Sequence, residues 1–384
     1  MAVGGADPVT YGLRRQTRIM TIIMSASHPG LVRAESFCTE FGLRLPILLA
    51  PMAGACPPSL SIAVAKAGGL GACGALLMQP EAIKAWAADV RAGSNGAFQI
   101  NLWIPDPAPA RDAEAEQAVR AFLGGWGPEV PAEAGDARPP DFEAQCTAIL
   151  EAGPVIVSSI MGLYPADFVA RMRDRGIKWF ANTTTVVEAR AAEDAGADVI
   201  VAQGMEAGGH RGAFDAAQAE AGMVGLFSLL PAIVDAVDVP VVATGGIADA
   251  RGVAAALLLG ASAVQIGTGF LRCPEAELPA AWADAIGAAR PEETLATRAF
   301  SGRLGRALTT AYTRAATAPG APPPAPYPVQ RGLTQAMRDD AARANDIDRM
   351  QAWAGQSARL APARPAGEIV LEIWEGARAL LGQG

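Results

Sequence analysis

The sequence predicts an α/β protein of the (β/α)8 TIM-barrel class, with an insertion after strand 3 and a helical C-terminal extension. Short apolar or β-branched runs bounded by Gly and Pro recur along the chain, and an Ala-rich stretch with helical spacing follows them. Eight such βα units are enough to close a barrel. An open doubly wound sheet is the structural alternative, but it usually carries a GxGxxG turn after its first strand, and here that strand ends in APMAGAC.

The predicted strands follow one another at intervals that leave room for a helix between them. They cover residues 46–52, 69–75, 98–104, 155–161, 177–183, 198–204, 241–247 and 263–270. Helices are predicted at residues 59–67, 80–91, 165–175, 186–195 and 249–259. Several of these helices begin at Asp, Ser or Pro and end near Gly, as helix capping favours.

Three regions are predicted along the chain. Residues 1–36 are interpreted as a poorly ordered extension: three arginines precede a short apolar stretch, as in a signal peptide, but Thr21 and Ser25 interrupt it, and Met20 or Met24 are alternative start sites. Residues 37–289 form the barrel, including an insertion at 105–153 that is rich in Pro, Gly and acidic residues. Residues 290–384 form a C-terminal extension, in which the proline-rich tract 318–328 leads into a helical tail from Thr334. We expect the insertion and the extension to cover the barrel mouth.

Composition favours a globular protein that acts on small molecules. Hydrophobic residues make up 51% of the chain and charged residues 18%, which supports a large core. The net charge is −8 and Lys and Arg are scattered, so we expect neither nucleic acid nor an anionic membrane as a partner. No apolar run reaches the ~20 residues that span a bilayer. The five cysteines form an odd set without CxxC spacing, which fits a reducing cytoplasm better than disulfides or a zinc site.

Two glycine-rich strand ends predict where a phosphate group would bind. In β/α barrels the loops after strands 7 and 8 commonly hold phosphate. Here strand 7 ends in Thr244-Gly245-Gly246-Ile247, ahead of a helix, and strand 8 ends in Gln265-Ile266-Gly267-Thr268-Gly269. Glycines let backbone N–H groups approach phosphate oxygens, and a helix N-terminus adds a favourable dipole. One glycine pair would indicate only a tight turn, but two on adjacent strands predict a phosphorylated ligand, either FMN or a sugar phosphate.

His210 is the predicted acid-base residue. It follows strand 6 in the glycine-rich loop QGMEAGGHRG, at the end of the barrel where catalysis occurs. The chain has one other histidine, His28, which falls in the predicted extension. An imidazole with an unperturbed pKa of ~6.5 exchanges protons near neutral pH. The alternative is a histidine that only bonds the loop backbone. A metal site is not expected, because Glu206 alone cannot complete one.

Other polar residues at strand ends have weaker claims. The Asn101 amide could bond a flavin ring or tie down a loop. Asn182, Thr183 and Thr184 are equally well explained as caps of the next helix. Cys56 and Cys73 lack an activating partner and are interpreted as packing residues.

Several motifs together resemble the nitronate monooxygenase family, formerly called 2-nitropropane dioxygenases. They are LPILLAPMAG, AGGLG at 67–71, QGMEAGGHRG, ATGGIAD, VQIGTGFL, AFSGR at 299–303, YPVQ at 327–330 and WAGQSA at 353–358. The resemblance runs from about Leu45 onward. It departs from the family at the end of strand 4, SSIMGLYP, where an aromatic or histidine-bearing segment is expected.

The resemblance implies a barrel that binds FMN non-covalently and oxidises alkyl nitronates, or also nitroalkanes, with O2 to a carbonyl compound and nitrite. His210 matches the family's active-site histidine, which would abstract a proton from a neutral nitroalkane or orient an anionic nitronate. The implied cofactor-binding residues are Ala50, Pro51, Met52, Asn101, Gln203, Gly208, Gly209, Gly245, Gly246, Gln265, Ile266, Gly267 and Thr268.

Two other functions remain as alternatives. Related barrels share the AGGH loop and the phosphate loops, so an NAD(P)H-dependent flavin reductase acting on an enoyl thioester or a quinone is the first. The tail motifs favour the monooxygenase. The second alternative is a flavin-binding protein without catalysis, against which the intact His210 and glycine loops argue.

Overall fold

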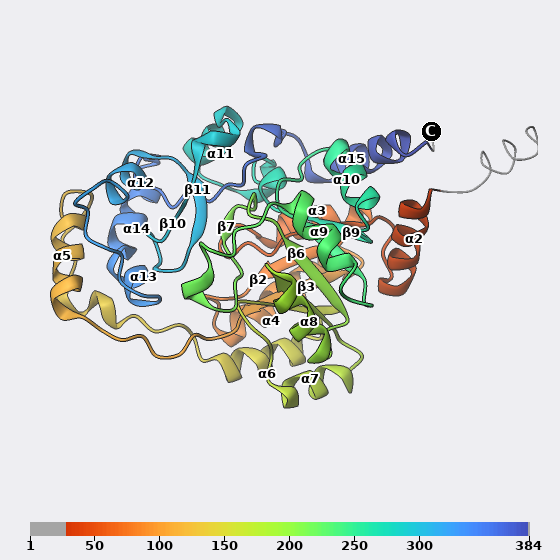
Figure 1. The fold of residues 1–384 in the computed structure, drawn as a ribbon, viewed down its shortest axis with the longest axis horizontal. Helices are drawn as coiled ribbons and strands as arrows, with labels where there is room; N and C mark the ends of the chain where they lie inside the picture. Colours follow the sequence, from red (N-terminus) through yellow and green to blue (C-terminus); the bar gives the residue numbers. More distant parts are fainter. Residues whose placement is uncertain (1–27, 383–384) are drawn as a thin grey trace, which may run out of the picture.

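An eight-stranded parallel barrel forms the centre of the protein (Figure 1), whose computed structural model describes residues 28–382. Its strands are β1 (Ile47–Leu49), β2 (Gly71–Gly74), β3 (Phe98–Trp103), β4 (Ile156–Ile160), β5 (Lys178–Thr183), β6 (Val199–Gln203), β8 (Val241–Thr244) and β9 (Ala263–Ile266). They pair in the order β1-β9-β8-β6-β5-β4-β3-β2. Leu70 closes the ring between β2 and β1, because its carbonyl accepts from Leu49 N at 2.9 Å and its N–H donates to Ile47 O at 3.2 Å. The predicted barrel is confirmed.

Helices that follow the strands cover the outside of the barrel. They are α3 (Pro58–Ala67), α4 (Pro80–Gly93), α6 (Phe142–Ala152), α7 (Ala166–Arg173), α8 (Val186–Asp194), α9 (Leu226–Val234) and α10 (Ala250–Leu258). The side chains of Asp141, Thr185 and Asp249 cap α6, α8 and α10 by accepting backbone N–H groups of the first turn. Each cap fixes the point where a strand-end loop turns back into a helix.

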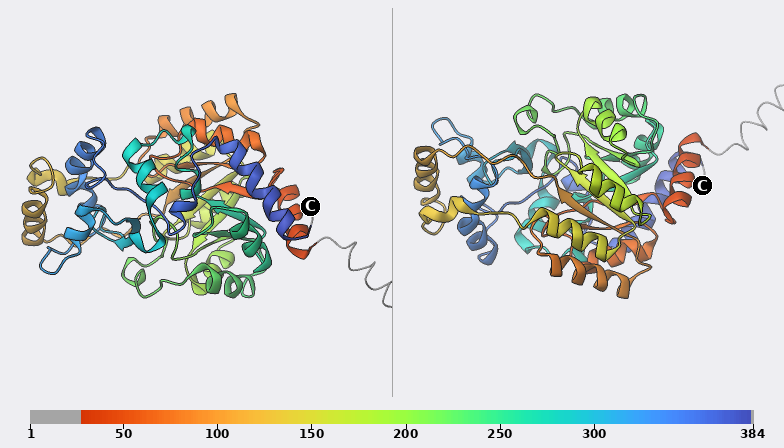
Figure 2. Two further views of the ribbon diagram at one scale, coloured as in Figure 1. Left: turned by 90° about the horizontal axis from the view of Figure 1, so that it is seen from above. Right: turned by 90° about the horizontal axis from the view of Figure 1, so that it is seen from below.

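The last helix of the chain completes this outer layer. Helix α15 (Ala366–Leu380) packs against both α10 and α3 and buries Ile369, Val370 and Ile373. Figure 2 shows this dark-blue helix beside the barrel, near the N-terminal helix. The prediction that all of residues 290–384 cover the mouth is therefore wrong for α15. The physical reason is the position of α11 (Ala280–Ala288), the helix that follows β9. It packs against the short turn at Ala358–Leu360, and α15 instead occupies the position beside α10 and α3.

The predicted insertion at 105–153 divides into two parts. Its last part is α6, which packs against α4 as an ordinary barrel helix, so the insertion proper ends before residue 142. Its first part carries α5 (Ala113–Leu123) and a 3₁₀ turn (Ala132–Asp136) away from the barrel. There it packs with α12 (Ala311–Ala316), α13 (Val329–Leu333) and α14 (Gln335–Arg343), forming the lobe at the left of Figure 1. Segments about 200 residues apart thus share one core, which contains Leu123, Phe300 and Met337.

A small antiparallel sheet connects the C-terminal extension to the barrel mouth. Its order is β10 (Thr294–Thr297), β11 (Gly305–Leu308) and β7 (Gly209–His210). The extension was predicted to be helical, and β10 and β11 correct that prediction. The sequence signal was missed because β10 and β11 are each four residues long, and β7, which pairs with β11, is a two-residue strand in a distant loop.

The N-terminal helix closes the opposite end of the barrel. Helix α2 covers Pro29–Phe41, and its Phe37 and Phe41 rings pack against Phe180 inside the barrel at centroid distances of 6.1 and 5.1 Å. The Nδ1 atom of His28 accepts from Gly30 N and caps the helix. The prediction of a poorly ordered extension is therefore wrong for residues 29–36, because burial of the apolar face of α2 orders them. Residues 1–27, with both alternative start sites, lie outside the described residues.

Alternation along the strands separates an apolar barrel base from a polar barrel top. Inward side chains near the base are apolar, such as Ile156, Val199 and Val242. Two or four residues further along each of these strands, the inward positions are polar. The inward polar residues of the barrel include Asn101, Ser158, Asn182, Gln203, Thr244 and Gln265. Since side chains alternate with a period of two, each parallel strand presents its last inward residue to the mouth.

Candidate active site

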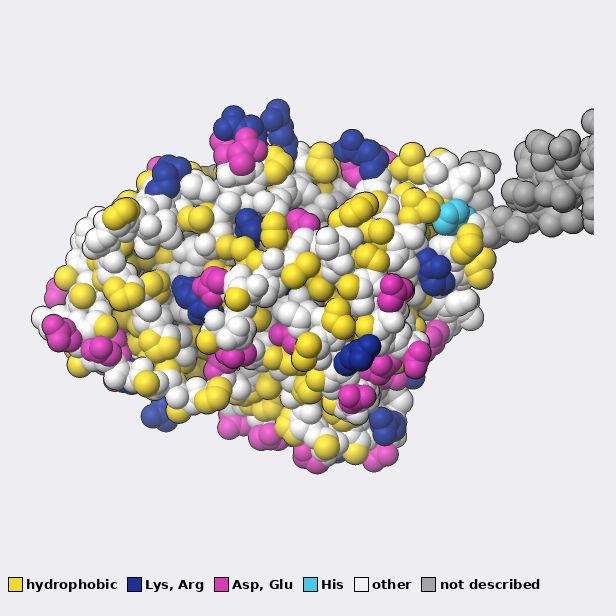
Figure 3. Space-filling model, viewed as in Figure 1, with side chains coloured by type: hydrophobic (Ala, Val, Ile, Leu, Met, Phe, Trp, Pro, Cys, Tyr) yellow, Lys and Arg dark blue, Asp and Glu magenta, His cyan; other side chains and the backbone are white. Residues whose placement is uncertain are grey.

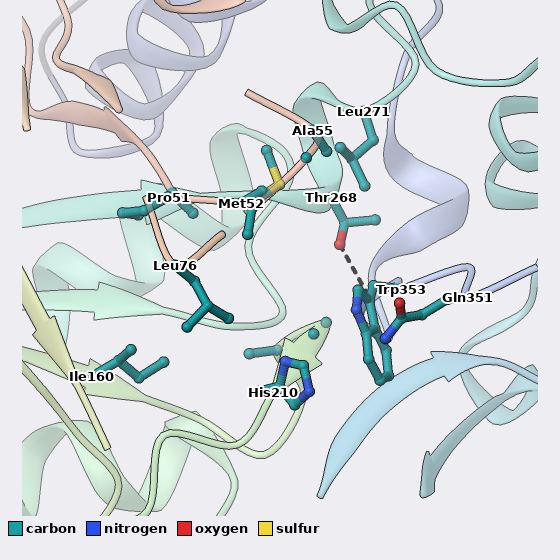
Figure 4. A pocket seen from close by; sticks show the side chains of 18 of the residues that line it. Pro51, Met52, Ala55, Leu76, Ile160, His210, Thr268, Leu271, Gln351 and Trp353 are labelled. Carbon is teal, nitrogen blue, oxygen red and sulfur yellow. Dashed lines mark hydrogen bonds between the residues drawn. The ribbon is translucent and has the colours of Figure 1, made fainter. Parts of the chain in front are cut away.

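A cavity of about 480 Å³ lies at the carboxyl ends of the barrel strands. This volume falls within the ~300–1,000 Å³ of small-molecule and cofactor sites. Figure 4 shows Pro51, Met52 and Leu76 on one side of it and His210 and Trp353 on another. All but one of the residues predicted for the site line it. These are Ala50, Pro51, Met52, Asn101, Gln203, Gly208, Gly209, His210, Gly245, Gly246, Gln265, Gly267 and Thr268.

Ile266 is the exception. Its side chain is 1% exposed and packs in the core between the barrel and its helices, because the inward residues of β9 are Ala263 and Gln265. The backbone carbonyl of Ile266 accepts from Ala50 N and joins β9 to β1. Ile266 is therefore removed from the set of cavity residues.

The glycines after β8 and β9 pack closely against neighbouring segments. Gly245 has φ +107° and Gly246 has φ +71°, which L side chains rarely adopt. A Cβ on Gly245 would lie 3.1 Å from Ala207 N and from Gly204 O. A Cβ on Gly267 would lie 3.3 Å from Ala50 Cβ and from Met52 Sδ. A side chain at either position would therefore displace a neighbouring segment of the cavity wall.

A carboxylate that is paired with Arg251 caps the helix after the first predicted phosphate loop. The Asp249 carboxylate caps α10 by accepting from Gly252 N at 3.1 Å, so a negative charge occupies that helix N-terminus. The pKa of Asp249 is lowered by its hydrogen bonds to Arg251 and to backbone, which outweigh the opposing effect of burial. Thr268 stays favourable for binding an anion, because its Oγ1 accepts from Gly355 N at 3.0 Å and keeps its own proton to donate.

His210 is held in place by aromatic rings and a hydroxyl. Its Nε2 lies 2.7 Å from Ser301 Oγ, within hydrogen-bond distance. Its ring packs edge-on against Trp103 and Trp353 at centroid distances of 4.6 and 4.8 Å. Gln203 fastens the loop, since its Nε2 donates to His210 O at 3.1 Å and its Oε1 accepts from Gly212 N at 2.8 Å. Among the described residues, no protein atom bonds Nδ1, so this nitrogen is available to a ligand.

The environment of His210 favours a neutral imidazole. Burial above all, together with the positive charges of Arg331, Arg303 and Arg338, lowers the pKa of His210 from 6.5 to about 3. Each of these effects penalises the protonated form. The sequence predicts an ordinary imidazole that titrates near neutral pH, and the tertiary structure corrects that prediction.

Sequence reasoning missed several residues that surround the histidine. Trp103, Ser301 and Trp353 contact it, while Arg331 and Arg338 contribute charge to the same cavity. Four of the five come from the C-terminal extension. The motif AFSGR contains Ser301, and WAGQSA begins at Trp353, so the resemblance marked both segments without assigning these residues a role.

The structure also locates the residues that had weaker claims to a function. Asn182 lines the cavity, whereas the Glu188 carboxylate bonds Thr184, and Thr183 is fully buried. Cys56 and Cys73 are buried, and burial raises the pKa of both thiols, that of Cys56 to about 12, as suits packing residues.

No cluster of three His, Cys, Asp or Glu side chains suited to a metal is present within residues 28–382. The helices that the structure describes include none with the length and apolar character needed to cross a membrane. Acidic and basic side chains are interspersed on the face drawn in Figure 3.

The fold and cavity together define a β/α-barrel protein with a ligand site at the strand ends, roofed by its C-terminal extension. Comparison with known proteins identifies the family of this barrel protein. Residues 35–376 match the nitronate monooxygenase family, and the chain belongs to that family. It is therefore an oxidoreductase, as the resemblance predicted.

Similar proteins cover nearly the whole chain. A nitronate monooxygenase from Paraburkholderia phytofirmans is 38% identical over 86% of this chain and 92% of its own length. One from Pseudomonas aeruginosa is 37% identical over 90% and 99%. A nitroalkane oxidase structure from Streptomyces ansochromogenes has a TM-score of 0.81 at 35% identity, covering 89% of this chain and 99% of that one. The structure of FabK from Thermotoga maritima has a TM-score of 0.69 at 26% identity, covering 90% and 96%.

Proposed function

We propose that this enzyme binds FMN in the cavity and oxidises alkyl nitronates with O2 to a carbonyl compound and nitrite. One observation carries the proposal: the glycine-rich ends of β8 and β9 and the imidazole of His210 line the same cavity. The nitronate monooxygenases to which the chain is similar support the same reaction.

The residues present fit FMN. A Cβ at Gly245 would crowd backbone, and one at Gly246 or Gly267 would crowd the side chains of Glu206 or of Ala50 and Met52. These three glycines, together with Thr268, would hold the phosphate. The segment Ala50–Met52 would lie against the ring and Asn101 would contact a polar edge. When bound, FMN supplies the electron chemistry, while the protein supplies position and a cavity shielded from water.

The charges around His210 favour a nitronate, already anionic, over a neutral nitroalkane as the substrate. Proton abstraction by His210 would create a buried imidazolium beside Arg331, Arg303 and Arg338. Burial first, and then these positive charges, lower the pKa of His210 and disfavour that state. A neutral imidazole can still accept or donate one hydrogen bond at Nδ1 and orient the substrate. We therefore assign His210 an orienting role with nitronates, with proton abstraction a minor activity.

Purified enzyme tests this proposal directly. We expect FMN absorbance, and nitrite release with oxygen uptake on nitronates. Turnover of the corresponding neutral nitroalkanes should be at least tenfold slower. The variant His210→Asn should retain FMN and lose turnover, and an unchanged kcat/KM would exclude a role for the imidazole.

An anaerobic experiment separates this function from the reductase alternative. A nitronate should bleach the flavin absorbance rapidly, and NADPH should not. Rapid bleaching by NADPH alone would assign the chain to the reductases, a result that its similarity to FabK makes worth testing. Flavin binding without bleaching by either compound would indicate a protein that does not catalyse the reaction.

A further inference from the structure

Two arginines of the C-terminal extension line the cavity on the side that carries His210. Arg331 lies in α13 and Arg338 in α14, and both side chains are partly buried. The two helices follow one another with only Thr334 between them. The two arginines are adjacent, because Nη2 of Arg338 donates to Arg331 O at 2.9 Å.

Neither guanidinium has a carboxylate partner at ion-pair distance among the described residues. Arg338 donates only to neutral acceptors, which are Thr334 Oγ1, the Gln351 and Gln335 side-chain oxygens and Arg331 O. The guanidinium of Arg331 donates to no protein atom within residues 28–382, and its nitrogens keep some exposure. Arg303, which is also buried in this region, is by contrast paired with Asp106. The carboxylate that acts on both arginines is that of Asp339, which is exposed and opposes, without reversing, the lowering of their pKa. Asp339 forms no ion pair with either of them and accepts a hydrogen bond from Gln335 Nε2 at 2.6 Å.

Such burial is unfavourable unless an anion compensates it. Desolvation lowers the pKa of Arg338 to about 10 and also lowers that of Arg331. Full burial of an ion costs several kcal/mol, and the partial burial of these arginines costs a fraction of that. A guanidinium without a bonding partner at the wall of a ligand cavity therefore indicates that the ligand supplies the negative charge.

The flavin phosphate is not the anion that this location favours. The phosphate loops belong to β8 and β9, whereas Arg331 follows Tyr327, whose ring packs 5.2 Å from that of Trp103. Trp103 in turn contacts His210. Arg331 is the charged group that most lowers the pKa of His210, which also indicates that it lies on the histidine side.

We propose that Arg331, with the charge of Arg338 behind it, forms an anion subsite that binds an oxyanion of the substrate. The inference rests on the proposed nitronate oxidation and deepens it. The oxyanion is either the nitronate group itself or a carboxylate at the other end of the substrate, and guanidinium recognises both through the same paired N–H geometry.

Arg331→Gln and Arg331→Lys test the subsite, with Arg343→Gln as a matched control. Arg343 lies in α14 and its side chain is 75% exposed, away from the cavity. Two nitronates of equal carbon number are compared, those of 1-nitropropane and of 3-nitropropionate. We expect R331Q to raise KM by about 10–100-fold, the loss of a charge-assisted hydrogen bond, and R331K to recover part of it. R343Q should resemble wild type, and FMN affinity should be unchanged in all three variants.

The outcomes separate the possible sources of the anion. If R331Q raises KM for both nitronates, the subsite binds the nitronate group. If R331Q raises KM only for the nitronate of 3-nitropropionate, the subsite binds the distant carboxylate. Equal KM values for R331Q and R343Q on both substrates would overturn the proposal, as would loss of FMN from R331Q. If wild type releases no nitrite from either compound, the proposed function fails. The subsite is then tested by adding propionate and measuring Tm. Propionate should raise the Tm of wild type and not that of R331Q, and equal Tm shifts in the two proteins would overturn the proposed subsite.

Discussion

Acidification should destabilise this protein through His210. The pKa of His210 is lowered to about 3 in the folded state, whereas an unfolded histidine binds a proton at about 6.5. Between these values the unfolded chain binds more protons than the folded one, so the free energy of unfolding falls as pH falls. The contribution of His210 is complete above pH 6.5 and is lost progressively toward pH 3.

The size of the effect follows from the same two pKa values. Lowering the pH from 7.5 to 5.0 should remove about 2 kcal/mol of stability through this residue. This is an upper limit, because the imidazole is partly accessible from the cavity. For a chain of this size, about 2 kcal/mol corresponds to about 3 °C in Tm.

The assay compares wild type with His210→Asn in ligand-free protein. Carboxylates that titrate over the same range affect both proteins equally, so the difference between the two pH-dependent losses isolates His210. NMR of the imidazole gives a second readout, and only two histidines need assignment. Equal losses in the two proteins, or an imidazole of His210 that titrates near pH 6.5, would refute the reasoning.

Three further substitutions test the packing around the site. Gly245→Ala should weaken FMN binding about tenfold. At φ +107° an alanine is strained by roughly 1–2 kcal/mol, and the free loop can relieve that strain only by leaving the conformation that binds phosphate. Flavin fluorescence titration measures this, and an unchanged Kd would remove Gly245 from the phosphate site. Asp106→Ala should destabilise the fold by about 3 kcal/mol, since it leaves the buried guanidinium of Arg303 unpaired; a Tm within 1 °C of wild type, a shift of about 1 kcal/mol or less, would contradict this. Gly208→Ala should lower Tm and speed proteolysis near residue 355, because the new Cβ would lie 2.5 Å from Gly355 N. An unchanged rate of proteolysis of that segment would show that the backbone adjusts easily.

The barrel and the cofactor side of the cavity could be predicted from local signals. A strand of alternating residues, a glycine pair and a helix cap each act within about ten residues, and barrel geometry then brings the strand ends together. For this reason the sequence alone predicts that Asn101, Gln203, Gly245 and Gln265 lie near one another, and all four line the cavity.

The histidine side of the cavity could not be predicted in this way. Ser301 bonds His210 across 91 residues of sequence, and Trp353 packs on the same ring from further along the chain. No periodicity links these positions. Their contacts depend on a three-stranded sheet that joins the extension to the loop after β6.

Local sequence patterns were sufficient to specify the barrel, the glycine-rich strand ends and the position of His210 at the mouth. These features follow from the period of the strands and from the conformational freedom of glycine, both of which are local properties. Three other features depend on the folded chain as a whole: α15 completes the outer helix layer, burial lowers the pKa of His210, and Arg331 lines the cavity without a partner among the described residues. Burial and electrostatic fields are sums over residues that are distant in the chain, so no local pattern encodes them.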